Sequence, residues 1–197
     1  MNTVGVVVTG DQTGDYYWAE SYPSKDRNKN NIVDYYRVPV YKLRINQYDS
    51  KWKVTASKDW TGLRFMPFYN DPKAPSLKYK SRGFLVAGLS SPRRGRVLKY
   101  KRNYGIQNTH SPFGGAIVIT GAFYIHAGPQ TLSEYGWGSA GCVEVIGNFD
   151  TYKKDIATLG GLSGNADDAI EKLVKSRRLY YDFKAASPPR LGIEKGY

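Results

Sequence analysis

Two apolar segments in the middle of the chain constrain its fold most strongly. Residues 116–120 read Ala-Ile-Val-Ile-Thr, residues 122–126 read Ala-Phe-Tyr-Ile-His, and only Gly121 separates them. β-Branched and aromatic residues favour strands, and one glycine inside such a run is typical of a bulge or kink. The sequence therefore predicts two neighbouring strands, the second of which ends at His126.

Other segments extend the β pattern. Residues 36–45 and 52–56 alternate apolar and polar side chains around a turn at 46–50, which predicts a hairpin. The first 37 or so residues are expected to form a strand and then a loop. Further strands are expected at residues 84–87, 96–100 and 180–183, with a turn at 90–95 and a loop at 70–76.

Helices are expected only near the end of the chain. Asp150 can cap a helix that ends at Gly160-Gly161, and Ser163 or Asn165 can cap a second one over residues 166–180. Acidic residues in its first turn and basic residues in its last turn suit the helix dipole. The predicted fold class is mainly β (α+β), with one or two late helices.

Cys142 is the only cysteine in the 197-residue chain, and His126 is one of its two histidines. A glycine-rich loop between them could bring the thiol back to the imidazole, which would take its proton and stabilise a thiolate as an ion pair. Gly141 permits a tight turn that aims the backbone amides of Gly141 and Cys142 at an oxyanion, and Ser139 can hold the loop. This pattern predicts a cysteine-dependent acyl-transfer enzyme. Taken singly, each residue also has an ordinary structural interpretation.

Ile-His-Ala-Gly at 125–128, followed by Ser-Ala-Gly-Cys-Val at 139–143, resembles the signature of L,D-transpeptidases, the YkuD-type peptidoglycan enzymes. The resemblance covers about residues 80–150. It implies a β-sandwich or cradle with flanking helices, and it makes Cys142 the nucleophile and His126 its base. Gly141 and Cys142 would form the oxyanion hole, supported by Ser139. Such enzymes attack the carbonyl on the L-centre of diaminopimelate in a tetrapeptide stem, expel D-alanine and need no metal or organic cofactor.

The chain departs from the family pattern at two positions. Ala140 stands where the family usually has histidine, and Glu144 stands where it usually has arginine. These changes favour hydrolysis, as in an L,D-carboxypeptidase, or D-amino-acid exchange over cross-linking. Candidate replacement cations lie in a Pro-Arg-Arg-Gly-Arg loop, and other residues could wall the substrate cleft. The substrate-binding candidates are Arg94 and Arg96, with Arg93 beside them, and Tyr124, Trp137 and His110.

One compact domain is expected overall, with residues 1–75 as a β extension integrated with the body and 76–197 as the catalytic region. The net charge of +12 favours an anionic partner. No run of about 20 apolar residues and no signal peptide is visible, so no membrane insertion is expected.

These features suggest an antibacterial effector that a contractile or type VI secretion machine delivers. It would be cytoplasmic before export and act in the periplasm or cell wall of a target bacterium. The expected partners are a peptidoglycan stem peptide, a cognate immunity protein and a component of the secretion machine, and not nucleic acid. A phage-associated protein and an excised domain are further origins. The alternative function is a non-catalytic basic binding module for peptidoglycan or nucleic acid.

Overall fold

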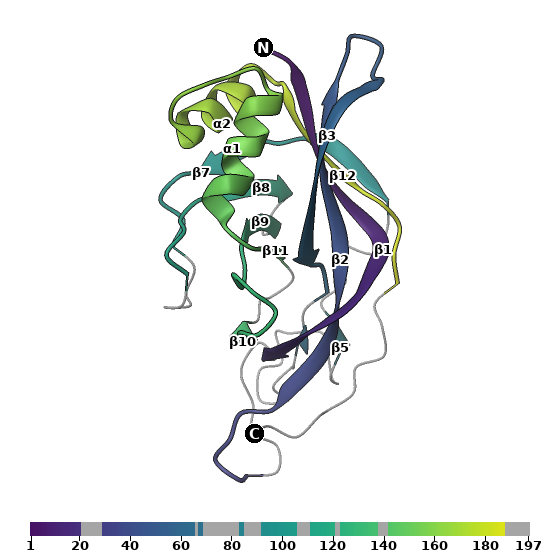
Figure 1. Ribbon diagram of the computed structural model, residues 1–197, viewed down its shortest axis with the longest axis vertical. Coiled ribbons are helices and arrows are strands. Elements are labelled where there is room, and N and C mark those ends of the chain that lie inside the picture. The colour runs from purple at the N-terminus through teal and green to yellow at the C-terminus, as the bar shows by residue number, and fades with distance from the viewer. Residues whose placement is uncertain are drawn as a thin grey trace.

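The computed structural model is mainly β with two helices, which confirms the predicted class (Figure 1). It describes residues 1–20, 29–65, 67–68, 83–84, 92–105, 111–120, 123–137 and 142–187. The first strands are β1 (Thr3–Glu20), β2 (Tyr35–Tyr48), β3 (Val54–Leu63), β4 (Pro67–Phe68), β5 (Gly83–Phe84) and β6 (Arg93–Arg96). The later ones are β7 (Lys99–Lys101), β8 (Ala116–Thr120), β9 (Phe123–Ala127), β10 (Tyr135–Trp137), β11 (Val143–Ile146) and β12 (Leu179–Phe183). The helices are α1 (Phe149–Leu159) and α2 (Ala166–Lys175).

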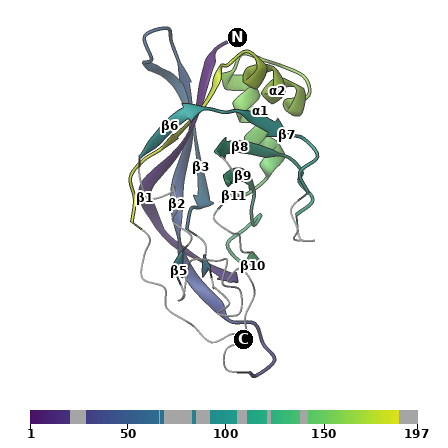
Figure 2. The same cartoon turned by 180° about the vertical axis from the view of Figure 1, so that it is seen from behind.

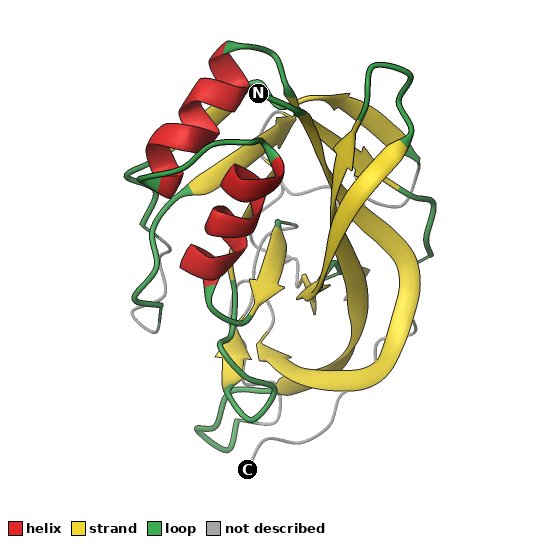
Figure 3. Cartoon of the chain, turned by 45° about the horizontal axis from the view of Figure 1, so that its top comes forward, coloured by secondary structure: helices red, strands yellow, loops and turns green. Residues whose placement is uncertain are grey.

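Ten of the described strands form one sheet that curls back on itself (Figure 3). Neighbours along the sheet run β6-β12-β1-β2-β3-β11-β9-β8-β7, and β10 pairs separately with the far end of β1. The register between β1 and β2 shifts between Val8 and Gln12 and again between Gln12 and Tyr16. Because such irregularities bend a strand, β1 can pair with β12 near its start and with β10 near its end.

Strand alternation gives the sheet two different faces. The inner face carries the core, with Val4, Val6 and Val8 of β1 fully buried. Helix α1 contacts β2 and β3, helix α2 contacts β7 and β12, and both add apolar side chains to the same core (Figures 1 and 2). The opposite, outer face lies away from the helices.

The expected extension, residues 1–75, supplies the middle of the sheet. Strands β1, β2 and β3 lie between β12 on one side and β11 on the other. The strands on their two flanks come from later in the chain, so the first third of the sequence joins them into one sheet. The expected boundary at residue 75 lies outside the described residues.

Several expected elements are confirmed. The hairpin at 36–45 and 52–56 is β2 and β3, and the two central segments are β8 and β9, which pair antiparallel. The expected strand at 180–183 is β12. Asn165 caps α2 by accepting a hydrogen bond from the Asp168 amide, and α1 ends at Gly160.

Other boundaries were predicted wrongly. Helix α1 begins after Asn148, whose side chain accepts from the Thr151 amide, so Asp150 lies inside the first turn. Helix α2 ends at Lys175 rather than 180, because Arg177 turns the chain with a φ of 57°. The expected short first strand runs on to Glu20.

The strand expected at 96–100 is also wrong. Strand β6 ends at Arg96 and β7 begins at Lys99, so Val97 and Leu98 interrupt the expected strand. β6 pairs with β12 where Gly95 lies against Tyr181, so close that a Cβ on Gly95 would stand 2.7 Å from the Tyr181 hydroxyl oxygen. The expected turn residues therefore form a strand, and a larger residue at position 95 would have to displace the Tyr181 ring.

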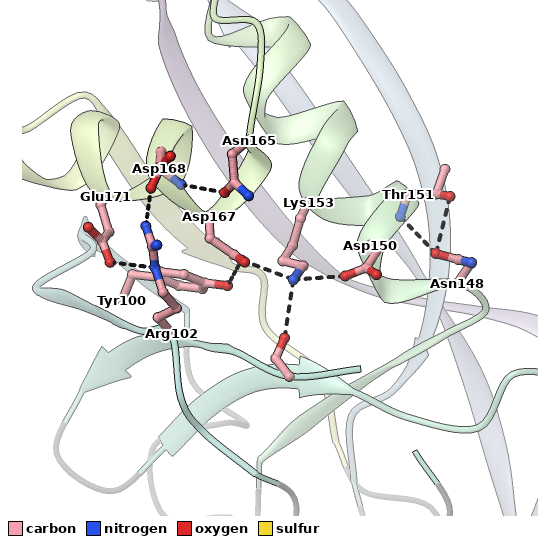
Figure 4. A network of polar contacts seen from close by, with 11 residues as sticks. Tyr100, Arg102, Asn148, Asp150, Thr151, Lys153, Asn165, Asp167, Asp168 and Glu171 are labelled. Carbon is pink, nitrogen blue, oxygen red and sulfur yellow. Dashed lines mark hydrogen bonds and ion pairs between the residues drawn. The ribbon is translucent and has the colours of Figure 1, made fainter. Parts of the chain in front are cut away.

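A polar network joins the two helices to the sheet (Figure 4). The nearly buried ammonium of Lys153 on α1 contacts Asp150 at 2.8 Å and Asp167 of α2 at 2.9 Å, and it donates to the Gly114 carbonyl at 3.3 Å. Tyr100 of β7 also donates to Asp167. Burial alone raises the pKa of Asp167, but hydrogen bonds from Tyr100 and Lys153 outweigh it and lower that pKa. The network thus fixes both helices against β7 and β8.

Arg64 lies fully buried just after β3. Its guanidinium donates to the Thr9 carbonyl of β1 at 2.6 Å and to the carbonyl of Lys184, which follows β12. The aromatic rings of Phe65 and Phe183 lie 5.2 and 5.6 Å from its centre. One side chain therefore bridges a backbone carbonyl of β1 and another just after β12, at the place where β1 leaves its regular register.

We expect Arg64→Met to lower the free energy of unfolding by about 2–4 kcal/mol, because two backbone carbonyls lose a charged donor. Urea denaturation measures this loss. The control is Arg44→Met, since Arg44 is exposed and, among the described residues, forms an ion pair only with the exposed Asp59; it should change stability by less than about 1 kcal/mol. Equal effects of the two substitutions would contradict a structural role for Arg64.

Candidate functional site

His126 and Cys142 come together on two neighbouring parallel strands. In the pairing of β9 with β11, Ile125 is opposite Val143 and His126 is opposite Glu144. Cys142 immediately precedes β11, and its thiol interacts with the backbone of Tyr124, as this register requires. Side chains of alternate residues share a face, so His126 and Cys142 both project from the outer face. The two side chains therefore lie on one face of adjacent strands, one diagonal step apart.

Other polar side chains surround this pair. Lys101 of β7 donates to the Tyr124 hydroxyl at 2.7 Å, and the Tyr104 ring lies 5.3 Å from the Tyr124 ring. The same Tyr104 ring lies 5.8 Å from the His126 imidazole. We name the group the Cys142 patch, and it consists of Lys101, Tyr104, Tyr124, His126, Cys142 and Glu144.

The imidazole of His126 is held in a defined tautomer. Its Nδ1 lies 2.7 Å from the Ala127 carbonyl oxygen. Because a carbonyl can only accept, Nδ1 carries the proton and Nε2 is the basic nitrogen. Burial lowers the pKa of His126 to about 4, with the Ala127 hydrogen bond acting in the opposite direction. The imidazole is therefore neutral at pH 7 and can accept a proton at Nε2.

The thiol of Cys142 is buried and also neutral. Burial raises its pKa to about 11, although the Tyr124 backbone and the Lys101 ammonium favour the thiolate. With a neutral imidazole beside it, this thiol does not form the resting ion pair that the sequence predicted. The sequence does not reveal how deeply the two side chains are buried. Cys142 is 9% exposed and His126 only 3% exposed, so charging either one costs desolvation free energy.

Glu144 stands where the resembling family usually has arginine, and its side chain is 1% exposed. Burial raises the pKa of its carboxyl to about 8, so that the group is mostly protonated at pH 7. Its Oε2 atom has no hydrogen-bond partner among the described residues. Gly128 allows the close approach, because a Cβ there would stand 2.8 Å from the Glu144 Cβ. Glu144 is thus a mostly neutral acid opposite His126 on the neighbouring strand.

The remaining predicted site residues have different outcomes. Ser139, Gly141 and His110 lie outside the described residues. Trp137 ends β10, where its backbone pairs with Ala19 of β1, and its side chain is likewise outside the description. Tyr124 belongs to the Cys142 patch through its contacts with Lys101 and Tyr104.

Arg94 and Arg96 are not beside the cysteine, which corrects the sequence-based expectation. They lie on β6, and four strands separate β6 from β11 along the sheet. Arg94 stacks on Trp52, and Arg96 donates to the Tyr180 hydroxyl. The cation of the patch is instead Lys101, which comes from the other edge of the sheet.

Lys101 and Tyr104 were missed by the sequence reasoning. A signal was present, because a basic residue and a tyrosine follow a short β-like segment shortly before the predicted central strands. It could not be used without the pairing of β7 with β8, which aligns Lys101 with Ala116 and, through β8 and β9, with His126. In this row of paired residues, the small Ala116 lies between Lys101 and His126.

Within the described residues, no group of three or more His, Cys, Asp or Glu side chains could hold a metal ion, and no helix is long and apolar enough to cross a membrane. Comparisons of the chain with family models, curated proteins and solved structures found no match.

We expect Glu144→Gln to stabilise the protein at high pH. Because folding raises the pKa of Glu144 from 4.5 to about 8, its contribution to stability is complete below about pH 4.5 and is lost as the pH rises towards 8. Glutamine cannot ionise, so the variant should gain a few kcal/mol over the wild type above pH 8 and differ little at pH 5. Urea denaturation across this pH range measures the difference. The exposed substitution Asp11→Asn is the control and should leave the pH profile unchanged; a similar gain in both variants would rule out burial as the cause.

Proposed function

We propose that the chain is a cysteine-dependent acyl-transfer enzyme acting on peptidoglycan stem peptides, with L,D-carboxypeptidase or D-amino-acid-exchange activity. The observation that carries the proposal is the placement of Cys142 and His126 on one face of adjacent parallel strands, with the basic nitrogen of His126 fixed by Ala127. The resemblance of residues 125–128 and 139–143 to L,D-transpeptidases supplies the substrate class.

The neutral resting state favours a general-base mechanism. As the Cys142 sulfur attacks the stem-peptide carbonyl, His126 Nε2 takes the thiol proton, so the thiolate never stands free in the buried patch. The imidazolium then gives this proton to the departing amine of D-alanine, and a thioester remains on Cys142. Water or the amine of a D-amino acid attacks the thioester, gives its proton to His126 and regenerates the thiol.

Glu144 supports hydrolysis or exchange over cross-linking within this proposal. A mostly neutral, buried acid stands where the family usually has arginine, so this position offers no cation to a negatively charged group of the substrate. Lys101 is the nearest cation of the patch and also favours the negative charge that develops on sulfur. The substrate must reach a thiol that is 9% exposed, so binding has to include local opening of the patch.

A non-catalytic binding module for peptidoglycan or nucleic acid is the second candidate, and one observation favours it. The thiol pKa of about 11 is the opposite of the depressed value that an activated cysteine usually has. A binding protein would tolerate such a buried, neutral thiol as an ordinary small apolar residue.

Mass spectrometry of purified tetrapeptide muropeptides distinguishes the two. We expect the wild type to release D-alanine, Cys142→Ala to release none, and His126→Gln to lose at least about a hundredfold in rate, because the general base is removed. Added D-methionine reports exchange through the product mass. Circular dichroism checks that both variants remain folded. Unchanged muropeptides with the wild type, on tetrapeptide and pentapeptide stems alike, would contradict the enzyme and favour the binding module.

We also propose that the activity serves as an antibacterial toxin countered by a cognate immunity protein. Expression with a periplasmic targeting signal should then lyse or round bacterial cells, whereas cytoplasmic expression should not. Cys142→Ala directed to the periplasm at the same level is the control and should be harmless. Equal toxicity of the wild type and Cys142→Ala would mean that the thiol chemistry is not the cause.

A further inference from the structure

Aromatic and arginine side chains gather on the outer face of the sheet at the turn between β2 and β3. Trp52 packs edge-on against Tyr180 of β12 with ring centroids 4.8 Å apart, and its ring lies 5.5 Å from that of Tyr48. The Arg94 guanidinium lies 4.4 Å from the centre of the Trp52 ring. Arg96 Nε donates to the Tyr180 hydroxyl at 3.1 Å. We name these five residues the Trp52 cluster.

The backbone of the Trp52 cluster adopts an unfavourable conformation at Trp52. Trp52 has a φ of 62°, a region that bulky residues rarely adopt, and its side chain is still 44% exposed. Gly5 lies beneath Tyr48, where a Cβ would stand 2.7 Å from the tyrosine ring. Strain of this kind persists where surrounding contacts hold it, and it concentrates at functional sites. An exposed tryptophan in a strained turn contributes little to the core, so its presentation to solvent needs another reason.

The charges around the cluster are unevenly paired. On the same face, Arg44 pairs with Asp59 at 2.6 Å and Lys184 pairs with Asp182 at 2.8 Å. Within the described part of the chain, Arg94 and Arg96 have no acidic partner, although both are exposed. Asp59 and Asp182 are thus already paired with other cations, and the guanidinium groups of Arg94 and Arg96 remain available to an external anion.

The geometry of the two arginines favours a repeating anion. They are two residues apart on one strand, so they project from the same face about 6–7 Å apart. Contact with an aromatic ring holds a guanidinium flat and leaves its N–H groups to bind carboxylate in a fork. The exposed Trp52 ring adds an apolar surface on which the C–H face of a sugar can pack.

We propose that the Trp52 cluster binds a glycan polymer that carries carboxylates, namely intact peptidoglycan, and anchors the protein on it. Arg94 and Arg96 bind carboxylates of neighbouring peptide stems, and Trp52 covers a sugar ring. The net charge of +12 adds long-range attraction to such a polymer. The choice of peptidoglycan rests on the proposed function. The cluster and the Cys142 patch lie on the same face of the sheet, and four strands separate β6 from β11.

Co-sedimentation with insoluble peptidoglycan sacculi tests the anchor in a Cys142→Ala background, where no turnover occurs. We expect Arg94→Gln/Arg96→Gln to weaken binding at least about tenfold, since two charge-assisted contacts are lost. Trp52→Gly should weaken it too, because glycine keeps the positive φ without strain and only the ring disappears. Lys172→Gln/Lys175→Gln removes the same charge from exposed positions on α2 and should bind like the parent.

The catalytic protein gives an independent readout. Arg94→Gln/Arg96→Gln should release D-alanine from soluble muropeptides at the normal rate and from sacculi more slowly. Sacculus binding by the Cys142→Ala parent without any D-alanine release by the wild type would support the anchor while the proposed enzyme fails. The anchor is overturned by failure of the parent to bind sacculi, by equal weakening in the α2 control, or by a single-stranded oligonucleotide that displaces the sacculi from the cluster.

Discussion

The parallel pairing of β9 with β11 is the constraint on which the candidate site depends. It alone sets His126 beside Glu144 and places Cys142 on the same face, one diagonal step away. Strand β11 has a second neighbour, β3, which brings the first third of the chain into contact with the strand that follows Cys142. Arg64 follows directly at the end of β3 and fixes the bend of β1, so the same segment that supports β11 also holds the curl of the sheet.

The two faces of the sheet differ in chemical character. The inner face is apolar, is covered by α1 and α2, and supplies the burial that stabilises the fold. The outer face carries both polar groups, the Cys142 patch and the Trp52 cluster. Burial makes the first group neutral, since the thiol, imidazole and carboxyl all have pKa values shifted towards their uncharged forms. Exposure keeps the second group charged. A buried, uncharged group and a solvated, cationic one therefore lie at different places on the same face of the sheet.

Sequence reasoning reached the elements that carry local signals. Periodicity located β8 and β9, alternation located the β2–β3 hairpin, and Asn165 marked the start of α2. It did not predict the elements whose conformation depends on contacts with distant parts of the chain. The run Thr9 to Asp15 contains many turn-forming residues, yet it continues β1 because β2 pairs alongside it through two register shifts. Arg93 to Arg96 look like a turn, but pairing with β12 extends them.

The residues of the candidate site were likewise predictable only where a local pattern in the sequence marks them. Cys142 and His126 were found because they are rare residue types joined by a loop-forming stretch. Their charge state was not, since it depends on burial under side chains from other strands. Lys101 reaches the patch only through a row of pairings across β7, β8 and β9. Arg94 and Arg96 belong to a different part of the sheet, which no local pattern in the sequence reveals.

The first and last described strands are hydrogen-bonded neighbours: Val4 to Val8 of β1 pair with Leu179 to Phe183 of β12. Contacts between such distant segments form late, because the intervening chain must first be ordered. A polypeptide emerging from a ribosome, or threaded unfolded through a transport channel, therefore has no complete sheet until nearly its whole length is free. Strand β11 needs only β3 and β9, which both precede it in the chain, so the thiol and the imidazole can become neighbours before the sheet is complete. The topology therefore delays completion of the sheet until the end of folding, but not the pairing that builds the candidate site.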